Sequence, residues 1–137
     1  MKAEQSSLYR HLEVLHLWGL ETFANAPKEV GVEFDIDEFL RNVIEAQTSV
    51  SFALEESNPK QRSDYLDIVA MNMGNVKSIT KVLTEYSSSK VDGGHVITKS
   101  KRVRLLSIMS QIGEELGRWR NKTLKKIEYD KTNDTFQ

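Results

Sequence analysis

The chain contains no cysteine, and its 137 residues include only two prolines and seven glycines. Without cysteine it cannot form a disulfide, a thiolate metal site or a cysteine nucleophile. Residues that interrupt helices are so sparse that the composition favours long helices over a sandwich or a barrel. At this length we expect one domain, residues 1–137.

The sequence also lacks a long apolar run. A membrane-spanning helix needs about 20 consecutive, mostly apolar residues, and no stretch approaches that. The first ten residues, MKAEQSSLYR, lack the apolar core of a signal peptide. We therefore expect a cytoplasmic protein with no membrane contact.

The net charge of −1 conceals opposite charges on the two parts of the chain. Residues 1–58 carry 4 basic and 11 acidic side chains, a net charge of −7, and residues 59–137 carry 15 basic and 9 acidic ones, a net charge of +6. Residues 99–126 alone carry 9 basic and 2 acidic side chains, a net charge of +7. The two parts can attract each other within one bundle or between copies, and the basic part could also bind nucleic acid.

The spacing of the apolar residues predicts four helices. They cover about residues 6–25, 35–57, 59–87 and 99–127, and the polar tail 128–137 is expected to fray. Each helix is amphipathic and can bury its apolar stripe only against the others. Four such helices with short connections predict an all-α fold, an up-down-up-down four-helix bundle.

Capping signals predict where the second and third helices begin. Asp35 with Glu38 three residues later resembles a capping box, in which each side chain accepts a hydrogen bond from a free backbone N–H. Asn58 is a good N-cap, Pro59 suits the first helical position, and Gln61 can complete a second box.

Three further features lie along the second half of the chain. Asn72 falls on the apolar stripe of the third helix, where a polar side chain without a partner costs about 1–3 kcal/mol. The polar, glycine-containing segment 87–94 predicts a connection. Thr98 or Ser100 is then expected to cap the fourth helix.

The fourth helix has one apolar seam with two glycines beside it. The seam residues recur at steps of three and four, and they are Leu105, Met109, Ile112, Leu116 and Trp119. Gly113 and Gly117 lie one turn apart, although a glycine in a helix interior costs about 1 kcal/mol relative to alanine. We therefore expect a second backbone to approach these glycines closely, within the bundle or in an oligomer, with Trp119 in the same packing surface.

The basic side chains of the fourth helix are the candidate functional site. Lys and Arg side chains that contact phosphates release counterions, which gives salt-dependent affinity without reading bases. Arg104, Arg118, Lys122 and Lys125 fall within a narrow arc opposite the seam. The full set of candidate nucleic-acid-binding residues is Arg102, Arg104, Arg118, Arg120, Lys122, Lys125 and Lys126. The alternative is a face that is only solvated.

Enzymatic and metal-binding patterns are weak. His11 and His16 are five residues apart, so they do not share a helix face as an i, i+4 metal pair would. A di-metal bundle needs Glu-x-x-His on each of two facing helices, and the chain does not carry that pair. It also has neither a Gly-x-Ser-x-Gly elbow nor a phosphate-binding glycine-rich loop. We expect no enzyme, no metal and no cofactor.

Five segments, in order, carry a resemblance to a known family. They are Ala26-Pro27-Lys28-Glu29-Val30-Gly31, Phe39-Leu40, Asn58-Pro59, His95-Val96-Ile97-Thr98 and Ile112-Gly113-Glu114-Glu115-Leu116-Gly117-Arg118-Trp119. Over about residues 8–126 the layout resembles the four-helix-bundle family of proteins encoded by 23S rRNA intervening sequences and of the accessory variability determinants of diversity-generating retroelements. The second group is the closer of the two.

The resemblance implies a homopentamer arranged as a tapered barrel with a central channel. It also implies a non-catalytic partner of a reverse transcriptase that binds the enzyme and its template RNA and supports mutagenic reverse transcription. The alternative that stays open is an interaction protein of the intervening-sequence type with no retroelement role.

Overall fold

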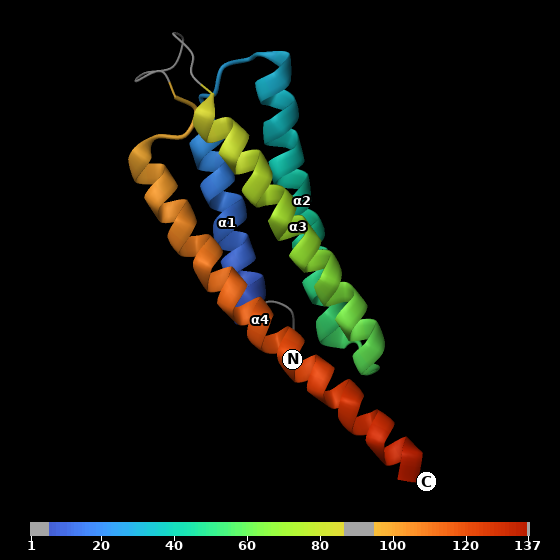
Figure 1. Ribbon diagram of the computed structural model, residues 1–137. Helices are drawn as coiled ribbons and strands as arrows, with labels where there is room; N and C mark the ends of the chain where they lie inside the picture. The colour runs from blue at the N-terminus through green and yellow to red at the C-terminus, as the bar shows by residue number, and fades with distance from the viewer. Residues whose placement is uncertain (1–5, 87–94, 137) are drawn as a thin grey trace.

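Four helices form an antiparallel bundle in the computed structural model of the protein, which describes residues 6–86 and 95–136 (Figure 1). The helices are α1 (Ser7–Phe23), α2 (Val30–Glu55), α3 (Pro59–Glu85) and α4 (Lys99–Phe136). Each helix packs against the helices before and after it, and α4 closes the ring against α1. The all-α, up-down-up-down four-helix bundle predicted from the sequence is confirmed.

The core is built from one apolar stripe of each helix. Leu12 and Leu15 of α1, Phe39 of α2, Leu66 of α3 and Ile112 of α4 are all completely buried. Close packing of this kind fixes the rotation of each helix about its axis, and therefore which side chains remain on the outside.

The glycine that permits close packing is Gly19, which the sequence analysis missed. A Cβ atom at Gly19 would lie 2.8 Å from Cε1 of Phe39. Phe39 cannot yield easily, because its ring packs edge-on against Phe23, at 5.2 Å between centroids, and also against Trp18, at 5.8 Å. Without a side chain at Gly19, α1 and α2 can approach each other at this point.

The predicted close approach at Gly113 and Gly117 is wrong for the single chain. A Cβ atom at either position would meet nothing within 4 Å. Gly113 is exposed and Gly117 is half-buried, so both lie at the edge of the seam rather than under a neighbouring helix. Trp119 is half-buried and packs against the core.

The predicted start of α2 at Asp35 is also wrong. The helix begins one turn earlier, at Val30, with Glu29 as an N-cap residue that makes no side-chain capping bond. Tertiary contacts explain the extra turn: Val32 is buried in the core, and the Tyr86 hydroxyl donates a hydrogen bond to the Glu29 carboxylate. These contacts stabilise a turn that has no local capping signal.

The predicted start of α3 is confirmed, with a different partner for one N–H group. The Asn58 Oδ1 accepts hydrogen bonds from the backbone N–H groups of Lys60 and Gln61, at 2.9 and 3.3 Å. The Asn58 N–H donates to Oε1 of Glu56 at 3.1 Å, rather than to Gln61. The Asn58 N–H is therefore satisfied by Glu56, two residues before the N-cap.

Helix α4 begins where it was predicted and ends later. Of the two expected caps, Thr98 is the one whose hydroxyl accepts a backbone hydrogen bond, from Lys101 N at 3.5 Å. The tail expected to fray continues the helix to Phe136, and this end extends beyond the other three helices (Figure 1). No glycine or proline follows Gly117, and an ion pair of 3.2 Å between Lys126 and Asp130 joins successive turns.

The connection predicted at residues 87–94 lies outside the described residues.

Candidate nucleic-acid interface

All seven candidate cations are exposed on α4, and they form two groups along the helix. Arg102 and Arg104 lie in its first two turns, and the other five lie between residues 118 and 126. At a rise of 1.5 Å per residue, Arg104 and Arg118 are about 21 Å apart along the helix axis. The structure therefore spreads the seven cations along α4 and does not join them into one patch.

Five of the seven side chains make no ion pair with any described residue. These are Arg102, Arg104, Arg118, Lys122 and Lys125. The other two are partly neutralised: Arg120 Nη2 lies 2.8 Å from Oδ1 of Asp67 on α3, and Lys126 pairs with Asp130. The Lys126 ammonium also lies 5.2 Å from the centre of the Tyr129 ring. Among the seven candidates, the unpaired positive charge therefore belongs to the first five.

These five cations lie on two flanks of α4. At 100° per residue, Arg104, Arg118, Lys122 and Lys125 fall within about 60° of one another, whereas Arg102 lies on the opposite side of the seam. The Arg104 side chain lines a pocket against α1, which assigns the four-residue arc to the flank next to α1. Arg102 shares its angle with Arg120, whose partner Asp67 belongs to α3. We refer to Arg104, Arg118, Lys122 and Lys125 as the α1-side arc.

Acidic residues separate the two groups. Glu114 is exposed, and Glu115 is held against α1, where its Oε1 accepts a hydrogen bond from the Ser7 hydroxyl at 2.8 Å and lies 2.7 Å from Nδ1 of His11. These contacts hold the Glu115 carboxylate against α1, whereas the Glu114 carboxylate is exposed between the two groups.

A pocket of about 420 Å³ opens between α1 and the first turns of α4. Val14, Leu17 and Trp18 line its α1 side with apolar surface, and Ser100, Lys101 and Arg104 line its α4 side. Two of the lining residues also join the helices, since Trp18 Nε1 donates a hydrogen bond to the Lys101 carbonyl oxygen at 3.1 Å. Sequence reasoning identified only Arg104 of these residues, because a pocket depends on which faces of two distant segments meet.

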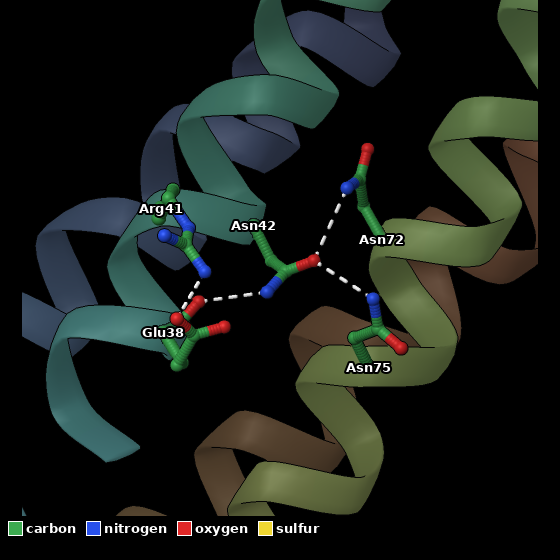
Figure 2. Close-up of polar contacts among 5 residues, drawn as sticks. All are labelled: Glu38, Arg41, Asn42, Asn72 and Asn75. Carbon is green, nitrogen blue, oxygen red and sulfur yellow. Dashed lines mark hydrogen bonds and ion pairs between the residues drawn. The ribbon is translucent and has the colours of Figure 1, made fainter. Parts of the chain in front are cut away.

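A cluster of three asparagines, of which Asn42 and Asn72 are buried and Asn75 is exposed, joins α2 to α3 (Figure 2). Asn42 Oδ1 accepts hydrogen bonds from Nδ2 of Asn72 and from Nδ2 of Asn75, both at 3.1 Å, and Asn42 Nδ2 donates to the Glu38 carbonyl oxygen at 2.8 Å. The partner expected for Asn72 is thus Asn42, although the buried Asn72 Oδ1 accepts no hydrogen bond. Because Asn72 and Asn75 both donate to Asn42 across the two helices, we assign this cluster to helix pairing rather than to a ligand site.

Metal-binding geometry is absent from the part of the chain that the structure describes. No three His, Asp or Glu side chains there are grouped as metal ligands. Glu13 and His16 of α1 form one Glu-x-x-His spacing, with no second such pair on a facing helix. Within residues 6–86 and 95–136, no helix combines the length and apolarity that crossing a bilayer requires.

Comparisons of this chain with protein-family models, with curated proteins and with solved structures found no match.

Proposed function

We propose that this protein is a non-catalytic, nucleic-acid-associated accessory protein of a diversity-generating retroelement. In this role it binds the reverse transcriptase and its template RNA and assembles as a homo-oligomer, a pentamer by its sequence resemblance. The observation that carries the proposal is the α1-side arc: four cations on one flank of α4, each exposed and none paired with a described carboxylate.

Unpaired cations support this function because a phosphate can use their full charge. Two of the four arc residues are arginines, whose guanidinium groups bind phosphate oxygens in a bidentate manner. An oligomer would present several copies of the arc, so that weak contacts to one RNA strand add together. Because the net charge is only −1, the protein does not attract RNA strongly at long range, so the affinity must come from these local contacts.

The test is the salt dependence of RNA binding. For single strands the slope of log K against log salt concentration is about −0.7 for each phosphate contact. The double variant Lys122→Gln/Lys125→Gln should therefore make this slope shallower by about 1.4. Fluorescence anisotropy with a labelled single-stranded RNA, from 50 to 200 mM salt, measures it.

A matched control separates the arc from net charge. Lys77 and Lys81 are exposed on α3, so Lys77→Gln/Lys81→Gln removes the same charge from another helix and should leave the slope unchanged. Equal effects of the two double variants would mean that binding follows overall charge, and the arc would lose its role.

The alternative is an interaction protein with no retroelement role. Exposed apolar side chains favour it, since Val30 is 85% and Phe34 63% exposed on α2, and such residues often lie in protein–protein interfaces. Light scattering and co-purification distinguish the two functions. A mass near five times 15.7 kDa, with capture of a reverse transcriptase encoded beside this chain, supports the first; oligomerisation without RNA or enzyme binding supports the second.

A further inference from the structure

We propose that the α1–α4 pocket binds one nucleoside monophosphate unit, with the phosphate at α4 and the base against α1. This inference deepens the proposed function, on which it rests, by assigning a site for a single nucleotide in addition to the phosphate contacts of the arc. The pocket volume of about 420 Å³ lies within the range of about 300–1,000 Å³ typical of small-molecule sites.

The α4 side of the pocket has the chemistry of a phosphate site. Arg104 is exposed and unpaired among the described residues, and Lys101 and the Ser100 hydroxyl lie beside it in the same wall. These residues belong to the first two turns of α4, where the positive end of the helix dipole adds to their charge.

The α1 side has the chemistry of a base site. Val14, Leu17 and Trp18 offer an apolar wall for a flat ring, and Leu17 is 57% exposed although it faces this pocket. A planar heteroaromatic ring could cover that surface, as a bare phosphate could not.

Two polar side chains at the same wall define which base fits. The Thr22 Oγ1 is buried and has no hydrogen-bond partner among the described residues, and Glu21 adds a carboxylate to the lining. A carboxylate accepts hydrogen bonds from an exocyclic amino group, as in its pairing with cytosine N4, and repels a second anion. The ligand therefore carries amino hydrogens at one end and a phosphate at the other, which describes the nucleotides of adenine and cytosine better than that of uracil.

Such a unit can be a free nucleotide or one residue of an RNA strand. Arg104 belongs both to the pocket and to the α1-side arc, so a strand that places one base in the pocket can continue toward Arg118 on the same flank of the helix. Between these two arginines the flank carries the exposed, uncharged Ser107 and Gln111, and the exposed Glu114 lies beside it.

Tryptophan fluorescence tests binding directly. The chain has two tryptophans, so Trp119→Phe leaves Trp18, which lines the pocket, as the only one. In this background AMP and CMP should change the Trp18 emission with a dissociation constant at least about fivefold lower than that of UMP, and inorganic phosphate should produce no such change. Absence of any response to AMP, or a response to phosphate equal to that of AMP, would overturn the proposal.

The variant Thr22→Val separates ligand binding from folding, because it removes the hydroxyl and nearly preserves the shape. The loss of one hydrogen bond should raise the AMP dissociation constant about fivefold. The melting temperature should stay unchanged or rise, since a buried oxygen without a partner has been removed. Thr22→Ser keeps the hydroxyl and should keep the affinity. An unchanged AMP affinity in Thr22→Val would contradict the assigned role of the hydroxyl.

Competition with RNA distinguishes this inference from the proposed function. Displacement of AMP by a short single-stranded RNA identifies the source as an RNA residue, and binding of AMP without displacement identifies a free nucleotide; both outcomes support the pocket. Salt-dependent RNA binding without any AMP response would overturn the pocket and leave the proposed function standing. A loss of oligomer mass in Leu17→Asp, again without an AMP response, would instead make the pocket a contact between copies.

Discussion

Helix α1 meets its two neighbours in different ways. Toward α2 it places Gly19 directly against the buried Phe39 ring, so that the two helices touch with no room for one more carbon atom. Toward α4 it leaves a pocket of about 420 Å³ and is held by polar contacts at Trp18 and at Glu115. The tight side fixes where α1 lies relative to α2, whereas the side toward α4 keeps an open pocket.

The largest effect should come from filling the tight side. Gly19→Val places a branched side chain where even a Cβ atom would be 2.8 Å from Phe39, and overpacking of this kind costs about 3 kcal/mol. Urea unfolding should show a lower midpoint with an unchanged slope. Gly113→Val is the matched control, because nothing lies within 4 Å of its Cβ position; its effect should be smaller than about 1 kcal/mol. Similar losses in both variants would show that the Gly19 contact is not special.

The two glycine positions also show what could be predicted from the sequence. Caps and periodic stripes are local, so Asn58, the seam of α4 and the bundle itself were predicted correctly. A glycine needed for close contact looks the same in sequence as one that faces solvent, since the difference lies in the opposite helix. The sequence therefore pointed to Gly113 and Gly117, whereas the close contact is at Gly19.

The same limit applies to the candidate site. The exposure of the α4 cations follows from the apolar seam alone, and it was predicted. The ion pairs of these cations were not predicted, because Asp67, the partner of Arg120, lies 53 residues away in the chain. The pocket beside Arg104 likewise depends on residues of α1, and the early start of α2 depends on Tyr86 at the end of α3.

An intermediate effect should come from the hydrogen bond that Trp18 makes between α1 and α4. Trp18→Phe removes the hydrogen bond from Nε1 to the Lys101 carbonyl oxygen, which is worth about 1 kcal/mol. The loss should also appear as faster amide hydrogen exchange in the first turns of α4. Trp119→Phe makes the same change of ring in a half-buried side chain whose indole makes no hydrogen bond to the described residues, so the difference between the two variants isolates the bond. Equal exchange rates in both would assign the effect to ring size.

The smallest effect should come from the contacts that Glu115 of α4 makes with Ser7 and His11 of α1. Glu115→Gln keeps the shape and an oxygen that can accept from the Ser7 hydroxyl, but it removes the charge beside Nδ1 of His11. The two side chains are 17% and 27% exposed, so water screens the contact and the loss should stay below about 1 kcal/mol. The exposed neighbour Glu114 provides the control, since Glu114→Gln should not change the midpoint of unfolding. The double variant with Trp18→Phe is the sharper measurement: additive losses mean that the Trp18 and Glu115 contacts hold α1 to α4 independently, and a combined loss well above the sum means that either one alone keeps these two helices together.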